Sequence, residues 1–145
     1  KTVGARLGKT LLELGGNNSV IIAESANLDL ALRAVLFAAV GTTGQRCTTL
    51  RRLIIHESIT DVFVKKLLQA YASIPIGDPW KGGILMGPLI DNRAVDTMMA
   101  AMEAIQHQGG EVLCGGKRIR IASRHFVREV ENGSASPAAA FDPNG

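Results

Sequence analysis

The sequence predicts an α/β fold with a largely parallel sheet flanked by helices. Short apolar runs of strand type alternate with longer segments of helical periodicity. Glycine pairs and a Gly-Asp-Pro turn separate these segments. With 145 residues, of which 46% are hydrophobic, the chain has the size and composition of one folded domain and not of a disordered polypeptide.

The first predicted elements are two strands and an apolar helix. Residues 10–14 form a short apolar run that ends at Gly15-Gly16, and residues 19–23 are rich in Val and Ile, so we expect a buried strand in each. Ser25 or Asn27 can cap a helix over residues 28–40. That helix is apolar almost all round, which predicts that it is covered on every side.

A strand and two helices follow. Residues 53–56 are predicted to form a strand, and Ser58 with Asp61 resembles a capping box for the next helix. Asp91 can cap a helix that runs to Gln108 and stops at Gly109-Gly110. We expect a short strand over residues 111–114. Residues 119–145 are basic at first and then rich in Pro, Gly and Ser, which is typical of a poorly ordered tail.

Composition excludes several functional classes. The net charge is +3, but the basic residues are scattered, and four Phe, one Tyr and one Trp leave little for base stacking, so we expect no nucleic-acid partner. No apolar run reaches the ~20 residues that span a bilayer, so we expect no membrane partner. Two cysteines favour a reducing compartment. We therefore expect a cytoplasmic location, with the mitochondrial matrix as an alternative.

The run from Gly41 to Thr49 carries the best candidate nucleophile. Cys47 follows a loop bracketed by Gly41 and Gly44, so its thiol can be partly exposed. We expect a helix to begin after it, and helix amides with neighbouring arginines favour the thiolate. Glu13 is the candidate base, because the leucines around it would desolvate its carboxylate and make it a stronger base. No set of residues predicts a metal site.

Each of these residues also has an ordinary structural interpretation. A lone cysteine such as Cys47 is most often a small buried hydrophobic residue. Glu13 alone is more often a surface residue, and Arg46 alone is more often a solvated charge. We expect Cys114 to be inert.

Two segments together resemble the signatures of the aldehyde dehydrogenase superfamily. They are Leu12-Glu13-Leu14-Gly15-Gly16-Asn17 and Gly44-Gln45-Arg46-Cys47, and Gly77-Asp78-Pro79 and Met86-Gly87-Pro88-Leu89-Ile90 match later parts of the pattern. The details are most similar to the antiquitin-like branch, the α-aminoadipic semialdehyde dehydrogenases. The resemblance covers residues 1–118, as part of the catalytic domain, with residues 1–16 at the cofactor-domain side.

The resemblance implies a reaction and a role for each residue. Cys47 would attack an aldehyde, its N–H would bind the oxyanion, NAD or NADP would take the hydride, and Glu13 would activate water. Arg46 and Thr48 would bind the substrate, and Leu14 and Gly15 the cofactor. The resemblance also implies a small aldehyde as substrate and a homo-oligomer.

The family's enzymes are longer, and this chain has no initiator Met, so we expect it to be a piece of a larger protein. The family's phosphate-facing loop and oxyanion Asn are absent from it, so the isolated chain is expected to be inactive. Two other hypotheses stay open: a non-catalytic remnant that acts as a binding or oligomerising module, and a cofactor-independent thiol esterase.

Overall fold

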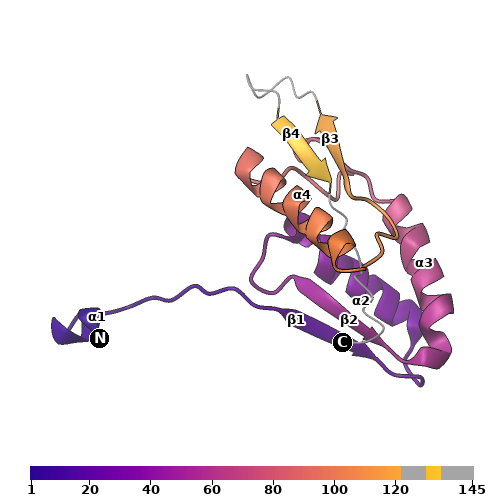
Figure 1. The fold of residues 1–145 in the computed structure, drawn as a ribbon, viewed down its shortest axis with the longest axis horizontal. Coiled ribbons are helices and arrows are strands. Elements are labelled where there is room, and N and C mark those ends of the chain that lie inside the picture. The colour runs from indigo at the N-terminus through magenta and orange to yellow at the C-terminus, as the bar shows by residue number, and fades with distance from the viewer. Residues whose placement is uncertain (122–129, 135–145) are drawn as a thin grey trace.

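A computed structural model describes residues 1–121 and 130–134 of the chain (Figure 1). Helices and strands alternate over the first half, as predicted, and the fold is a part of an α/β domain. In chain order the elements are α1 (Thr2–Ala5), β1 (Asn18–Ile22), α2 (Leu28–Val40), η1 (Gly41–Gly44), β2 (Leu50–Ile55), η2 (Glu57–Ile59), α3 (Thr60–Ala72), α4 (Asn92–His107), β3 (Lys117–Ile121) and β4 (Val130–Ser134).

Strands β1 and β2 form a parallel pair, the part of the predicted sheet that positions the candidate site. Asn18 pairs with Leu50, but Ser19 pairs with Arg52, so Arg51 is an extra residue at the start of the pair. From there the register is regular to Ile22 and Ile55. Strands β3 and β4 form a second, antiparallel pair, which lies beside α4 in Figure 1.

Helix α2 has the predicted bounds because its sequence is locally consistent. The side chain of Asn27 accepts a hydrogen bond from the N–H of Leu30, as an N-cap should, and Gly41 ends the helix. Its buried residues contribute to the core that α2 and α3 share. The prediction that α2 is covered on all sides is wrong for this chain, since Leu30 and Phe37 are 61% and 62% exposed.

The core lies between α2, α3 and the inner face of the parallel pair. Phe63 is fully buried at its centre, and Met86 enters it from the loop before α4. The buried members are Ile22, Val35, Ala39, Val40, Leu50, Phe63, Leu67 and Met86. This packing fixes the end of α2 relative to the start of β2, which are the two elements that flank Cys47.

The strand predicted over residues 10–14 is wrong. Residues 6–17, called the N-terminal arm here, extend away from the body of the molecule (Figure 1). Leu11 and Leu14 are 87% and 72% exposed. A strand needs a neighbour to accept its backbone hydrogen bonds, and the part of the chain that the structure describes supplies none for these residues.

Two other local predictions are wrong. Residues 111–114 are irregular, and β3 begins only at Lys117, after Gly115 and Gly116 adopt positive φ. Ser58 does not cap α3: it lies in η2, where its N–H donates to Nδ1 of His56, and α3 starts at Thr60. Both errors come from short signals without strong periodicity.

Helix α4 confirms the prediction for residues 91–108. The carboxylate of Asp91 accepts a hydrogen bond of 2.7 Å from the N–H of Ala94, and Gly109 at φ +86° ends the helix. Val95 and Met102 form its buried face. Among the residues described, no helix is both long and apolar enough to cross a membrane.

The tail predicted over residues 119–145 falls mostly outside the described residues. Residues 122–129 and 135–145 are not described. The described residues of this segment belong to β3 and β4, an antiparallel pair that the sequence pattern did not indicate.

Candidate active site

The backbone is strained in the loop that leads to the candidate nucleophile. Thr42 and Thr43 in η1 have φ values of +54° and +55°, in the left-handed region that β-branched residues avoid. The Thr43 hydroxyl is buried and donates a hydrogen bond of 2.9 Å to the carbonyl of Gly87. Non-glycine residues persist in this region only when their surroundings hold them there, and such strain is concentrated at functional sites.

Cys47 lies in a tight turn between η1 and β2. The N–H of Thr49 donates to the carbonyl of Arg46 at 3.1 Å, and the N–H of Arg46 donates to the hydroxyl of Thr49 at 3.1 Å. Thr49 is buried, whereas Cys47 is exposed, which confirms the predicted exposure of the thiol. The predicted helix after Cys47 is wrong, because β2 begins at Leu50. No helix amides therefore favour its thiolate.

The two sequence motifs meet at this turn. The side-chain amide of Asn18 donates hydrogen bonds to the carbonyls of Cys47 and Thr49, at 2.7 and 2.9 Å. These two bonds are called the Asn18 clamp below. Gly16 lies against the same carbonyl, since a Cβ there would be 3.0 Å from the oxygen of Cys47.

Gln45 ties the turn to the loop before α4. Its side-chain nitrogen donates to the carbonyl of Pro88 at 3.3 Å, and its side-chain oxygen accepts from the N–H of Ile90 at 2.9 Å. With the bond from Thr43 to Gly87, these contacts join the Gly-Gln-Arg-Cys motif to the Gly-Pro-Leu-Ile motif. Sequence reasoning missed Asn18, Gln45, Thr43 and Thr49 as residues that hold the turn.

The side chain of Arg46 turns back over the end of α2. Its guanidinium carbon lies 5.3 Å from the ring centroid of Phe37, within the range of a cation–π contact. A Cβ on Gly41 would collide with the guanidinium of Arg46, so a larger residue at position 41 would displace that side chain. The Nε of Arg46 is buried without a hydrogen-bond partner among the described residues. Arg51 and Arg52, the other predicted cations, are exposed on β2.

Glu13, Leu14 and Gly15 lie on the N-terminal arm. All three are exposed, so the predicted desolvation of Glu13 is wrong for this chain. In the described part of the molecule the Glu13 carboxylate makes no hydrogen bond or ion pair. The arm reaches the turn at Gly16, three residues further along, so the structure brings the motif that contains Glu13 to Cys47 without joining the two side chains.

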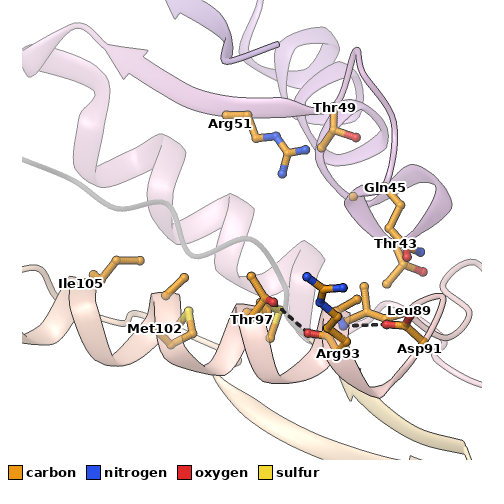
Figure 2. Close-up of a pocket in the computed structure, with 14 residues that line it drawn as sticks. Thr43, Gln45, Thr49, Arg51, Leu89, Asp91, Arg93, Thr97, Met102 and Ile105 are labelled. Carbon is orange, nitrogen blue, oxygen red and sulfur yellow. Dashed lines mark hydrogen bonds between the residues drawn. The ribbon is translucent and has the colours of Figure 1, made fainter. Parts of the chain in front are cut away.

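A cavity of about 660 Å³ lies between η1, β2 and α4 (Figure 2). One wall comes from the turn and β2, and α4 forms the opposite wall, with Met98, Met102 and Ile105 as its apolar part. Cys47 does not line it. Its lining residues are Thr43, Gly44, Gln45, Thr49, Arg51, Leu89, Asp91, Arg93, Ala94, Thr97, Met98, Ala101, Met102 and Ile105. Within the described ranges no three His, Cys, Asp or Glu residues group as metal ligands.

Comparisons with known proteins agree on one family. The sequence model of the aldehyde dehydrogenase family matches residues 1–128. The alpha-aminoadipic semialdehyde dehydrogenase of Mus musculus is 54% identical over 136 residues, which are 94% of this chain and 25% of that protein. The Bos taurus protein of the same name is 52% identical over 115 residues, 79% of this chain and 21% of that protein.

Solved structures show the same relationship. Lactaldehyde dehydrogenase from Escherichia coli matches with a TM-score of 0.80 and 28% identity, over 91% of this chain and 26% of that one. Betaine aldehyde dehydrogenase from Staphylococcus aureus in complex with NAD+ matches with a TM-score of 0.75 and 28% identity, over 83% and 23%. The chain thus spans about a quarter of the length of the curated relatives it matches.

Proposed function

Because the chain belongs to the aldehyde dehydrogenase family, we propose that it carries the nucleophile for NAD(P)-dependent oxidation of an aldehyde to a carboxylic acid. One observation carries this proposal: the Asn18 clamp holds the turn of an exposed Cys47 against the end of the Glu13 motif. An exposed thiol in a rigid turn suits a nucleophile better than a core residue.

The thiolate of Cys47 attacks the aldehyde carbon. A C–S bond forms, and the electrons of the carbonyl double bond move to oxygen, giving a thiohemiacetal. The backbone N–H of Cys47, which has no partner among the described residues, donates to that oxyanion.

Two residues of the arm, Leu14 and Gly15, are the part of this chain that contacts the cofactor in the proposed reaction. A Cβ built on Gly15 meets no atom within 4 Å, so the backbone at Leu14 and Gly15 is open to a ligand. NAD or NADP, when bound, would supply the acceptor for the hydride that leaves the thiohemiacetal carbon. The electron pair on the oxyanion then re-forms the carbonyl double bond, so Cys47 is left carrying a thioester.

Glu13 completes the reaction as a general base. It takes a proton from water, the hydroxide attacks the thioester carbon, and the C–S bond breaks, which releases the carboxylic acid and the Cys47 thiolate. In this chain Glu13 is exposed on the arm, so this role requires the arm to fold over the turn.

We take α-aminoadipic semialdehyde as the substrate, since the relatives from mouse and cattle carry its name. Arg46 supplies a guanidinium, which pairs well with a carboxylate, one residue before the nucleophile. Thr48, exposed on the other side of Cys47, adds a hydroxyl.

A chimaera tests this function. The aligned segment of the Mus musculus relative is replaced by this chain, and NADH formation from α-aminoadipic semialdehyde is followed. We expect activity in the chimaera and in its Cys114→Ser variant, and loss of activity in Cys47→Ser. Activity that survives Cys47→Ser would disprove the assignment, and thermal melting of each variant checks that it is folded.

A cofactor-independent thiol esterase is the second candidate. The observation that favours it is that the exposed thiol and the unpaired N–H of Cys47 both lie in the described turn, with no cofactor contact needed. Hydrolysis of p-nitrophenyl acetate by this chain, lost in Cys47→Ser, is its test.

A further inference from the structure

Asn18 directly follows the first motif, and among the described residues it is the one whose side chain donates a hydrogen bond to the backbone of Cys47. Its amide nitrogen donates to the carbonyl of Cys47 at 2.7 Å and to that of Thr49 at 2.9 Å, residues that lie 29 and 31 positions further along the chain. A side-chain amide has two N–H donors, so both are used here. Such a complete use of donors fixes the amide and both carbonyls.

The clamp replaces backbone pairing at the point where the parallel sheet begins. Asn18 pairs with Leu50 and Ser19 with Arg52, so Arg51 bulges out of the ladder. The Asn18 side chain bonds to the carbonyls just before β2. The hydrogen bonding of the sheet therefore continues through this side chain into the turn of Cys47.

The clamp sets the direction of one backbone donor itself and of a second one through Thr49, whose carbonyl it holds. A trans peptide unit holds its C=O and N–H in opposite directions. The bond from Thr49 to the carbonyl of Arg46 directs the N–H of Cys47 away from Thr49, and the bond from Asn18 to the carbonyl of Cys47 directs the N–H of Thr48 away from Asn18. Neither N–H has a partner in the described part of the chain.

Gly16 gives independent support for the clamp. A Cβ at this position would lie 2.8 Å from the Asn18 side-chain oxygen and 3.0 Å from the carbonyl oxygen of Cys47. Real Cβ atoms essentially never come as close as the first contact, and the second is tighter than nine in ten real contacts of a Cβ. A glycine at residue 16 therefore lets the end of the arm, Asn18 and the turn pack together.

We propose that Asn18 is a positioning residue, which fixes the N–H of Cys47 so that it meets the oxyanion formed when the thiolate attacks a carbonyl carbon. The identity of that reaction rests on the proposed function, whereas the clamp rests on the hydrogen bonds described. Loss of the clamp should slow acyl transfer, which forms an oxyanion. It should leave the rate of alkylation unchanged, because alkylation forms no oxyanion.

The test compares Asn18→Asp with Asn17→Asp in the full 145-residue chain. Both variants add one negative charge at neighbouring positions, but only the first removes the two donors and faces two carbonyl oxygens with a carboxylate. With p-nitrophenyl acetate, the thiolate of Cys47 displaces p-nitrophenolate and keeps the acetyl group on sulfur. With iodoacetamide, the same sulfur displaces iodide.

We expect Asn18→Asp to lower the rate of acylation about tenfold or more and to change the rate of alkylation by less than about twofold. We expect both rates in Asn17→Asp to stay close to those of the wild type. Equal acylation rates in the two variants would overturn the proposal. A parallel fall in acylation and alkylation would also overturn it, because a merely structural role predicts that result.

Amide hydrogen exchange separates the clamp from the reaction. NMR should show that the N–H of Thr49 exchanges faster in Asn18→Asp, and in the uncharged Asn18→Ala, than in wild type or Asn17→Asp. If the wild-type chain is not acylated, the positioning role of Asn18 is rejected, whereas the chimaera still tests the proposed function and faster exchange at Thr49 still supports the clamp. Unchanged exchange in both Asn18 variants rejects it.

Discussion

The two cysteines differ in their surroundings, which predicts a difference in reactivity. Cys47 is exposed in its turn, whereas Cys114 is half-buried near Tyr71. Limiting iodoacetamide at neutral pH should therefore label Cys47 first, as peptide mass spectrometry would show. Preferential labelling of Cys114 in folded protein would contradict the assignment of the nucleophile, and labelling in denaturant, where both thiols are exposed, is the control.

Tyr71 should titrate at unusually high pH. Burial and then the nearby Cys114 raise the pKa of Tyr71 to about 12, from 10.0. At a pH between these two values the folded state keeps a proton that the unfolded state loses. The free energy of unfolding is therefore highest below pH 10 and falls as the pH rises from 10 through 12. The fall amounts to roughly 3 kcal/mol at most.

The titration can be followed directly, because Tyr71 is the one tyrosine of the chain. Absorbance at 295 nm should give a midpoint near pH 12 in folded protein and near 10 in denaturant. In Cys114→Ser the midpoint should fall, since the thiolate contribution is gone. A folded-state midpoint near 10 would mean that the phenol is hydrated.

At the scale of single residues, sequence reasoning found the groups but not their contacts. The loop around Cys47 predicted an exposed thiol, and the structure confirms it. The Asn18 clamp was missed because its hydrogen bonds cross 29 and 31 residues. The position of Arg46 over Phe37 was missed because rotamers depend on the neighbours that packing supplies.

Among the elements, η1 offers a clear test of stored strain. Thr42 is exposed at φ +54°, and a glycine there would remove the clash of its side chain with the backbone. Thr42→Gly should raise the free energy of unfolding by about 0.5–1 kcal/mol and the melting temperature by a few degrees.

Thr48→Gly is the matched control, since Thr48 is also exposed but does not have positive φ. It should lower the free energy of unfolding by about 0.5–1 kcal/mol, because glycine loses more freedom on folding. A destabilised Thr42→Gly would show that η1 is not strained. Calorimetry of both variants distinguishes these outcomes.

Helices were predicted better than strands because their signals are local. The caps at Asn27 and Asp91 gave the start of α2 and α4 correctly. The apolar run of residues 10–14 resembles a strand, but a strand exists only beside a partner. Residues 10–14 have no neighbouring strand among the described residues.

The whole molecule leaves apolar surface uncovered, which predicts association. Leu7 and Leu11 on the arm are 95% and 87% exposed, and the paired Ile21 and Ile54 are 73% and 53% exposed on the outer face of a parallel sheet. Parallel sheets are normally covered on both faces. The isolated chain should therefore form dimers or larger assemblies at micromolar concentration, in agreement with the predicted homo-oligomer.

Light scattering measures this association. Leu11→Asp with Leu14→Asp should reduce it by removing apolar arm surface, whereas Glu24→Asp, at an exposed site off the arm, should not. A concentration-independent monomer with a cooperative melt would show that the chain forms a closed core by itself.

The extended N-terminal arm also exposes the chain to cleavage by a protease. Exposed, extended backbone fits a protease cleft, whereas helices and paired strands do not. An enzyme that cuts after glutamate should therefore act first at Glu13. The product that begins at Leu14 would keep Gly16, Asn18 and every hydrogen bond of the Cys47 turn, so the proposed base can be removed from the nucleophile without touching its scaffold.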